Sequence, residues 1–450
     1  MTDINVKDLT EAGVLSLSET FAEPDWLRDR RLEAYKAFSD LEWPHKRIEE
    51  WRRTDPARFD LSRGVRSHAG KVDPRSAGVV AAAGDLAASA RIIDGAVAHV
   101  EVSPDAAAQG VVVADLATAA RDHRGLVEPA LGAAIGPEAK FEALSLAAFT
   151  GSVVVAVPAE VELDAPVGIT VQVTGPGTIL PRVLIIGGAY SKCAVYVDHA
   201  GDADVMVVEA VETVLAEGAQ ADVVTTQDWG DGVQAVANHT GRVDRQASYR
   251  HLEVTLGGDF QYIRPDVRLV GEGGHGELFG VYFTDDGQHV EHRSIIHHDA
   301  SHTSSEAVYK GALQGDSRAI WYGNIMIEAH AKSTSSDETN RNMLLSDGAR
   351  ADSIPFLEIK TSDVASCGHH SSIGQVDEAQ LFYLESRGIP RAEAARLLVF
   401  GFFAEVTDRI DLPGVTETVL AELEREVKSG PVTLDPRRQQ ARGEDEREAG

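Results

Sequence analysis

The sequence predicts a mainly β fold: a right-handed parallel β-helix, or solenoid, flanked by N-terminal and C-terminal helical domains. Short runs with β propensity recur through the middle of the chain between Gly, Asp and Asn residues, and helical patterns are confined to its two ends. A doubly wound fold would instead interleave amphipathic helices of about 10–15 residues. No strict repeat period is present, so the pattern alone leaves a large irregular β-sandwich open.

Residues 1–90 are predicted to form the N-terminal helical domain. The segment EPDWLRDRRLEAYKAFSDL begins with Pro24, which suits the first turn of a helix, and spaces Leu27 and Phe38 with other apolar residues at roughly helical intervals. Pro44 then interrupts the helical pattern, which resumes around Trp51.

Residues 91–365 are predicted to form the β-helix core. One helical insert is expected at Phe141–Phe149. The clearest expected strands, in chain order, are SVVVAVPAEVEL, PRVLIIGG, CAVYVDHA, DVMVVEAVETVLAE, ADVVTTQDW, SYRHLEVTLG and GELFGVYFTDD.

Residues 366–432 are predicted to form the C-terminal helical domain. Asp377 is a plausible N-cap of its first helix, Gly388 ends that helix, and Pro390 starts a second, largely apolar helix. Such a hairpin would cap the solenoid and could also bind a partner. The charged tail, residues 433–450, is expected to be disordered.

The bulk composition excludes several classes of protein. With 42 basic and 71 acidic residues, the net charge of −29 argues against binding to nucleic acid and to anionic membranes. Two cysteines cannot build a disulfide framework. The N-terminus has no secretory pattern and the apolar runs are too short to span a bilayer, so a cytoplasmic protein is expected.

Most of the histidines and one cysteine are interpreted as structural. Cys193 lies in an apolar strand and is expected to be a small buried residue. Five histidines gather between positions 289 and 302, but the segment reads as strand and turn and lacks an H-E-x-x-H arrangement. Packing and hydrogen bonding are therefore preferred to a metal site for His289, His292, His297, His298 and His302, with Thr303, Ser304 and Ser305 as partners.

The segment DVASCGHHSSIG, residues 363–374, is the strongest candidate for chemistry. It reads as a Gly/Ser-rich turn between the β region and the helices, with Cys367 followed by His369 and His370. A protonated imidazole nearby would lower the pKa of the thiol. If the stretch is extended, Cys367 and His369 share a face. One thiol and one imidazole are too few for a complete iron–sulfur or zinc shell, so further ligands would have to come from another chain.

Several motifs together resemble the SufB/SufD scaffold family of the SUF iron–sulfur assembly system. They are YKG at 309–311, N-x-N-x-L-L at 340–345, P-x-L-E-I at 355–359 and QLFYLESRGI near the C-terminal end, with a matching N-terminal helical segment. The resemblance implies a β-helix that pairs with a paralogous subunit and binds one SufC ATPase through its C-terminal helices.

Within that family the chain resembles the SufD type more than the SufB type. SufB-type chains carry a cysteine before the P-x-x-E strand, where this chain has Ala349 and no cysteine in the stretch 346–354. SufB-type chains also tend to carry a cysteine where this chain has Leu384. SufD-type chains carry a Cys-x-His turn, which Cys367-Gly368-His369 matches.

The resemblance implies the roles of the site residues. His369 would be a metal ligand donated across the heterodimer interface, with Cys367 as its auxiliary neighbour. No tightly bound cofactor is implied, only a transient iron–sulfur cluster shared with the partner subunit; a homodimer of the isolated chain is possible. The chain lacks a P-loop motif and is not expected to be an enzyme on its own. The ATPase-binding residues would be Leu381, Phe382, Leu384, Phe400, Phe402 and Phe403.

Two other hypotheses stay open. A β-helix enzyme acting on polysaccharide would need clustered carboxylates, for which Asp285, Asp286 and Asp299 are candidates. A SufB-type, cluster-holding subunit would need a cysteine in the stretch 346–354, which has none.

Overall fold

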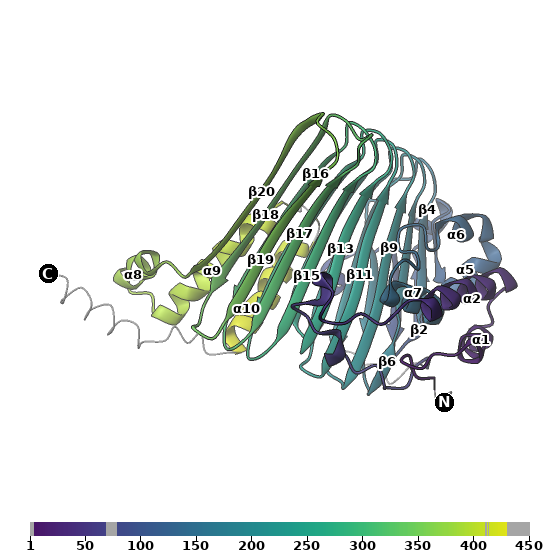
Figure 1. The fold of residues 1–450 in the computed structure, drawn as a ribbon, viewed down its shortest axis with the longest axis horizontal. Helices are drawn as coiled ribbons and strands as arrows, with labels where there is room; N and C mark the ends of the chain where they lie inside the picture. The colour runs from purple at the N-terminus through teal and green to yellow at the C-terminus, as the bar shows by residue number, and fades with distance from the viewer. Residues whose placement is uncertain (1–3, 69–78, 410–411, 413, 430–450) are drawn as a thin grey trace.

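The computed structural model describes residues 4–68, 79–409, 412 and 414–429, and the predicted tail 433–450 lies outside them. It confirms the predicted fold class. The chain forms a β-solenoid of about eight turns, with helices in its N-terminal and C-terminal regions (Figure 1).

Two ten-stranded sheets form the walls of the solenoid. The first has the strand order β2-β1-β5-β8-β10-β12-β14-β16-β18-β20 and the second the order β19-β17-β15-β13-β11-β9-β7-β4-β3, with β6 paired to β9. The bounds of the first sheet are β1 Ala88–Ile93, β2 Ala96–Val102, β5 Val167–Gln172, β8 Lys192–Gly201, β10 Gln220–Trp229, β12 Ser248–Gly257, β14 His275–Thr284, β16 Ser304–Leu313, β18 Thr334–Leu344 and β20 Val364–Gln375. Those of the second are β3 Val112–Asp115, β4 Ser152–Val157, β6 Gly177–Ile179, β7 Arg182–Gly187, β9 Val205–Leu215, β11 Val233–Val243, β13 Phe260–Leu269, β15 His289–His298, β17 Arg318–Ile327 and β19 Arg350–Ile359.

From β7 to β20 successive strands alternate between the two sheets, and neighbours within a sheet run parallel in register. Because side chains alternate along a strand, every second residue enters the interior. Val, Ile and Ala fill most of these positions, as a parallel sheet buried on both faces requires. Where coils stack tightly at a corner, glycine is needed: Gly257 has φ +77°, and a Cβ there would lie 2.0 Å from the carbonyl oxygen of Trp229.

The N-terminal helices cover the outer face of the second sheet. They are α1 Glu11–Thr20 and α2 Asp25–Asp40, followed by 3₁₀ turns at Glu49–Trp51 and Pro56–Arg58. The Trp51 ring stacks on Tyr262 with centroids 4.2 Å apart. The predicted helical insert is confirmed as α7, Lys140–Ala148, which is buried and packs against α2 and β9. Two shorter helices, α5 Leu116–Asp122 and α6 Arg124–Ala130, pack against β3, β4 and β7 of the second sheet, and α4 Pro104–Ala108 precedes them in the chain. The short α3 Val79–Ala82 lies instead on the first sheet, against β5 and β8.

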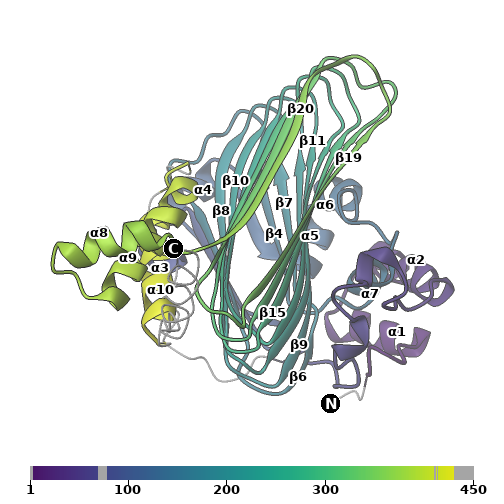
Figure 2. The same cartoon turned by 60° about the vertical axis from the view of Figure 1, so that its left-hand side comes forward.

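The C-terminal helices are α8 Glu378–Ser386, α9 Arg391–Thr407 and α10 Val415–Ser429. Helices α9 and α10 pack on the outer face of the first sheet, and α8 packs against α9 (Figure 2). Asp377 caps α8 by accepting hydrogen bonds from the backbone N–H groups of Ala379 and Gln380, as predicted. The ammonium of Lys310 on β16, 2% exposed, donates to the carbonyl oxygen of Phe402 at 2.8 Å and to Glu405, which fixes α9 to the sheet.

The strands run to Gln375, so the expected boundary between residues 365 and 366 falls inside β20, and the C-terminal helices begin at Glu378. No helix in the described part of the chain is long and apolar enough to cross a membrane.

Candidate functional site

The site lies on the last turn of the solenoid, which β18, β19 and β20 form. In β20, Cys367 pairs in register with Ser336 of β18, and His369 with Glu338. Gly and Ser favour strands weakly, but the hydrogen-bond ladder with β18 overrides that preference. The stretch from Cys367 to Gly374 is therefore strand, and its predicted assignment as a turn is wrong.

Cys367 and His369 lie on the same face of β20 because side chains alternate along a strand. This face is the inner one, since Cys367 packs against the hydrophobic interior. His370 lies on the opposite face, with its Nε2 atom 3.6 Å from Asp337. His369 itself is exposed, because no further coil follows β20 in the described chain.

The thiol of Cys367 is half-buried, and its pKa is raised by burial and by the nearby carboxyl groups of Glu338 and Asp337. This differs from the expectation that a neighbouring imidazolium would lower the pKa, because carboxyl groups are the charges that act on the thiol here. The thiol is therefore protonated at neutral pH, and an incoming cation would have to displace its proton.

Glu338 is the residue of this turn that sequence reasoning missed. Its side chain points into the solenoid, the residue is 1% exposed, and neither carboxyl oxygen has a hydrogen-bond partner of ordinary geometry among the described residues. Burial raises its pKa to about 8, partly offset by the backbone N–H of Phe356. The sequence does contain a pattern that could have revealed Glu338. In a strand expected to be buried, every second residue is polar: Ser336, Glu338, Asn340 and Asn342.

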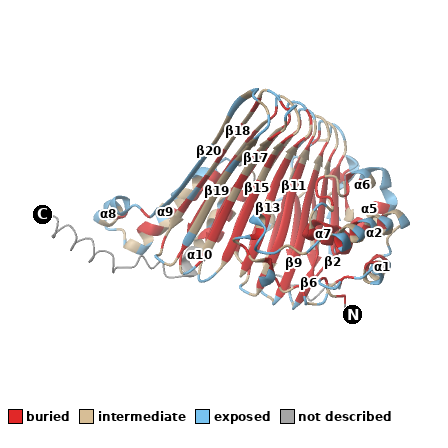
Figure 3. Ribbon diagram, in the orientation of Figure 1, coloured by how far each residue is buried: buried red, intermediate tan, exposed pale blue. Residues whose placement is uncertain are grey.

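The last turn presents an open edge. Within the described residues, β19 and β20 end their sheets, and each pairs with one neighbour only. Figure 3 shows that burial falls from the middle of the solenoid towards these strands. Large apolar side chains are exposed on them: Phe356 is 50%, Ile359 41% and Ile373 45% exposed. Unpaired backbone groups beside apolar side chains are suited to pairing with another chain.

Cys367 also borders a surface groove of about 450 Å³. Ser305, Ser336, Asp337, Ser366 and Gly368 are among its other lining residues.

The six aromatic and aliphatic residues expected to bind a partner ATPase differ widely in exposure. Phe382 is 72% exposed, whereas Leu381 and Phe403 are fully buried against the solenoid. Leu384, Phe400 and Phe402 are partly buried. Beside Phe382, an apolar groove of about 360 Å³ lies between α8 and α9, lined by Ala379, Gln380, Tyr383, Leu384 and Leu398. Phe382 and this groove are thus the accessible part of the helical surface.

The histidine cluster between 289 and 302 is held by hydrogen bonds, as predicted for His298. Its ring lies 2.7 Å from Thr303 Oγ1 and 3.0 Å from Ser305 Oγ. Burial lowers the pKa of His298 to about 4, so the ring is neutral at pH 7. His289 and His292 are buried beside Thr54 and Thr255; His302 is exposed at a turn. Only His297 joins a set with metal-like spacing, with Asp299 and Glu328. Cys193 is buried, as predicted.

A second group that the sequence did not reveal is a buried row of imidazoles and carboxylates inside the middle coils. His199 Nε2 lies 2.5 Å from Glu209 Oε1, and His239 bridges Glu209 at 3.3 Å and Glu253 at 2.7 Å. Burial alone would lower the pKa of His239, but the two flanking carboxylates outweigh it and raise the pKa to about 10. The pKa of His199 is also raised, because the Glu209 carboxylate outweighs the opposing effect of burial. Two imidazoles that favour their charged forms therefore face two carboxylates along the row.

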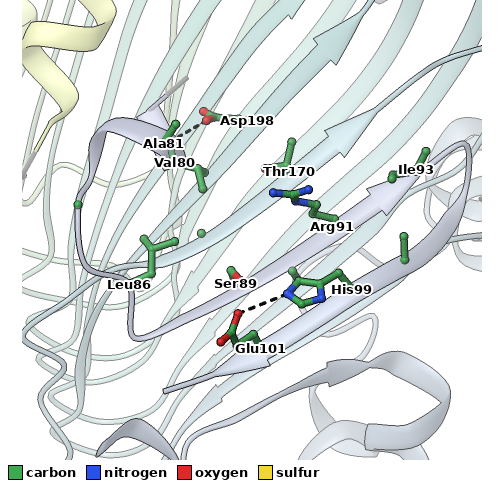
Figure 4. A pocket seen from close by; sticks show the side chains of 14 residues that line it. Val80, Ala81, Leu86, Ser89, Arg91, Ile93, His99, Glu101, Thr170 and Asp198 are labelled. Carbon is green, nitrogen blue, oxygen red and sulfur yellow. Dashed lines mark hydrogen bonds and ion pairs between the residues drawn. The ribbon is translucent and has the colours of Figure 1, made fainter. Parts of the chain in front are cut away.

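The residues required by the polysaccharide hypothesis do not come together. Asp285 and Asp286 follow β14, whereas Asp299 follows β15 in the other sheet. β15 starts at the edge of the solenoid where β14 ends and runs to the opposite edge. Asp299 therefore lies one ten-residue strand, or about 30 Å, away from Asp285 and Asp286. A cavity of about 590 Å³, lined in part by Arg91 and by the His99–Glu101 ion pair, lies near β1 and β2, at the other end of the solenoid from Cys367 (Figure 4).

The fold and the last turn together define a β-solenoid scaffold whose open end carries a thiol and an imidazole. The chain belongs to the SufBD family of the SUF iron–sulfur cluster assembly system. The family model described as "SUF system FeS cluster assembly, SufBD core domain" matches residues 170–402.

Curated relatives agree with this family. An iron–sulfur cluster assembly SufBD family protein of Mycobacterium tuberculosis is 38% identical over 316 residues, 67% of this chain and 77% of the relative. The iron–sulfur cluster assembly protein SufD of Bacillus subtilis is 27% identical over 428 residues, 92% of this chain and 97% of the relative. A SufBD family protein of Staphylococcus haemolyticus is 24% identical over 432 residues, 91% of each chain.

Proposed function

We propose that the chain is a non-catalytic scaffold subunit of a cytoplasmic iron–sulfur assembly complex. Its last solenoid turn pairs with a SufB-type paralogue, its C-terminal helices bind a SufC-type ATPase, and a nascent cluster forms where the two solenoids meet. The cluster is cargo that both chains share rather than a resident cofactor. Membership of the SufBD family supports a part in iron–sulfur cluster assembly, and the geometry of the last turn supports the roles proposed for Cys367 and His369.

The observation that carries the proposal is the position of Cys367 and His369 on an open turn. A thiol and an imidazole from one chain leave an iron shell incomplete, because iron–sulfur clusters generally take four protein ligands. The open edges of β19 and β20 offer the place where a second solenoid could add its strands and its ligands. The same edge would let two copies of this chain pair when no paralogue is present.

The helical surface supports the second interaction. Phe382 and Tyr383 are 72% and 56% exposed beside the apolar groove between α8 and α9. Because Lys310 ties α9 to β16, a force applied to these helices would reach the solenoid wall near the last turn. Movement of a bound ATPase could therefore open or close the interface that holds the cluster.

Adjacent histidines provide a matched test of this function. The three proteins are co-expressed and purified anaerobically, and iron and acid-labile sulfide are measured per complex for wild type, His369→Ala and His370→Ala. His369 faces the interior and His370 the opposite surface, so both variants remove an exposed imidazole from one strand. We expect His369→Ala to lose iron and sulfide while His370→Ala retains them, with equal assembly of all three complexes.

Two results would count against the proposal. If the chain bound neither the SufB-type nor the SufC-type protein, the scaffold role would be wrong. If the complex formed but His369→Ala held as much cluster as wild type, the turn would serve assembly alone, and the ligands would belong to the partner.

A further inference from the structure

We propose that Glu338 is an iron ligand, and that together with Cys367 and His369 it gives this single chain a binding site for ferrous iron inside its last turn. The inference rests on the proposed function, which assigns Cys367 and His369 to the cluster interface. It adds a third ligand, which comes from a different strand. It also names the ion that is bound, Fe²⁺, which the chain could hold before sulfide is delivered.

The first argument is the isolation of the Glu338 side chain. Carboxyl groups are seldom fully buried without a partner, because burial removes the water that would solvate them. Glu338 is 1% exposed, and no side chain in the described part of the chain forms a hydrogen bond with its carboxyl oxygens; only the backbone N–H of Phe356 is close enough to favour the charged form. Glu209 and Glu253 are equally buried, but each is bonded to an imidazole. Glu338 therefore keeps unused acceptor capacity inside the solenoid, which a bound cation would satisfy.

The second argument is register. Glu338 and His369 are direct partners on adjacent parallel strands, and Cys367 is one step further along the same face. Neighbouring strands lie about 4.8 Å apart, so rotation of the side chains alone can bring the three donors onto one ion.

The third argument is that a glycine leaves room for the carboxyl group of Glu338. Gly323 on β17 lies beneath Glu338, and a Cβ at that position would be 2.5 Å from Glu338 Oε2 and 2.2 Å from the Trp321 ring. Any larger residue would displace the carboxyl. Two other inward polar atoms near this position, Trp321 Nε1 and Ser353 Oγ, also have no partner within the part of the chain that the structure describes.

The donor set indicates the ion. Carboxylate, imidazole and thiolate together suit a borderline divalent metal such as Fe²⁺, and they do not suit Mg²⁺ or Ca²⁺, which take oxygen ligands. Three protein donors leave further positions on iron free for sulfide and for a ligand from the partner chain. The site therefore matches an ion that is to be passed on rather than stored.

The test uses the isolated full chain under anaerobic conditions, titrated with Co²⁺ as an optically visible probe for Fe²⁺. Thiolate-to-cobalt charge-transfer absorption reports the Cys367 bond, and its dependence on concentration gives the affinity. The variants are Glu338→Gln and, as matched control, Glu358→Gln, which removes a 42% exposed carboxylate of β19 that pairs with Lys360. Gly323→Ala is the second variant, since it should displace the Glu338 carboxyl without removing it.

We expect Glu338→Gln and Gly323→Ala to weaken Co²⁺ binding at least about tenfold, and Glu358→Gln to change it less than about twofold. Thermal melting should show that Glu338→Gln is folded, because a neutral amide of the same shape replaces a buried acid. The inference is overturned if wild type binds no Co²⁺, if Glu338→Gln binds as wild type does, or if Glu358→Gln weakens binding equally.

Failure here is distinguishable from failure of the proposed function. If Glu338→Gln has normal Co²⁺ affinity while His369→Ala still empties the three-protein complex of cluster, the scaffold function stands without Glu338 as ligand. If the complex does not form at all, the proposed function fails whatever the cobalt titration shows.

Discussion

Inside the middle coils, the positive charge of His239 is enclosed by two carboxylates. His199, Glu209, His239 and Glu253 are each 1% exposed or less, so water cannot solvate their charges. Each carboxylate is instead bonded to an imidazole, Glu209 to His199 and His239 and Glu253 to His239, so the charges stabilise one another only while all four residues are present. Removal of one member leaves an uncompensated charge in the core, whereas removal of a surface charge does not.

We therefore expect His239→Gln to lower the free energy of unfolding by about 3–5 kcal/mol. The substitution keeps the approximate size of the side chain but leaves Glu209 and Glu253 without the cation that they share. Urea unfolding followed by circular dichroism measures the change. His99→Gln, at an exposed ion pair with Glu101, is the control and should change stability by less than about 0.5 kcal/mol. Equal effects of the two variants would contradict the charge-balance account.

The same histidine predicts a pH dependence. Its pKa is raised from 6.5 to about 10 in the folded chain, so its contribution to stability is complete below about pH 6.5 and is lost as the pH rises through 10. The difference in unfolding free energy between wild type and His239→Gln should thus shrink between pH 6.5 and pH 10. A difference that stayed constant over this range would show that His239 is neutral in the native state.

At the scale of elements, two of the family motifs are explained by packing. In N-x-N-x-L-L, the side chain of Asn342 donates to Asn340 at 2.7 Å, and Asn340 donates to the hydroxyl of Tyr282 at 3.0 Å. In YKG, Tyr309 is buried inside the solenoid while Lys310 holds α9 outside it. These motifs stabilise the last coils and the helical hairpin; the candidate ligands lie outside them.

The α8–α9 hairpin gives the next prediction. Phe382→Asp should weaken binding of the SufC-type ATPase by about 2 kcal/mol or more, because it places a charge at the most exposed large apolar side chain of the described chain. Isothermal titration calorimetry with the purified ATPase measures the affinity. Leu126→Asp on α6, a 48% exposed leucine at the other end of the molecule, is the matched control and should bind normally. Normal binding by Phe382→Asp would place the ATPase elsewhere.

The helices and strands show how much of this structure can be predicted from the sequence. Short strands with small residues at the corners favoured the solenoid but left a β-sandwich open. Asp377, Gly388 and Pro390 predicted the two ends of α8 and the start of α9, because caps act locally. The strand at Cys367 was missed, because its conformation is imposed by β18, about thirty residues earlier. Glu338 was missed for the same reason: its isolation depends on Gly323, Trp321 and Phe356 from other strands.

At the scale of the whole molecule, the two ends of the solenoid differ. At the N-terminal end, β2 and β3 pair antiparallel with β1 and β4, and helices lie beside them. At the other end, β19 and β20 face outwards with Phe356 and Ile373 exposed. Within the described residues, the solenoid therefore has one covered end and one open end, and the open end is the one that the proposed function assigns to pairing.

The double variant Phe356→Lys/Ile373→Lys should weaken pairing with the SufB-type paralogue at least about tenfold, because two charges would be buried in the interface between the two solenoids. Sedimentation velocity of the mixed chains measures it. Tyr190→Lys, at a 54% exposed position in the turn between β7 and β8, is the control and should leave pairing intact. Unchanged pairing by the double variant would place the interface away from the last turn.

The open edge of β19 and β20 has a consequence for the cell that makes this protein. Backbone groups on a strand edge recognise little beyond spacing, so an unoccupied edge accepts any available strand, including one from a partly folded chain. Chains made in excess of their partner would accumulate as misassembled or degraded material. On the proposed function, the soluble yield of this chain should therefore rise when the SufB-type paralogue is produced beside it, and an unchanged yield would contradict this consequence.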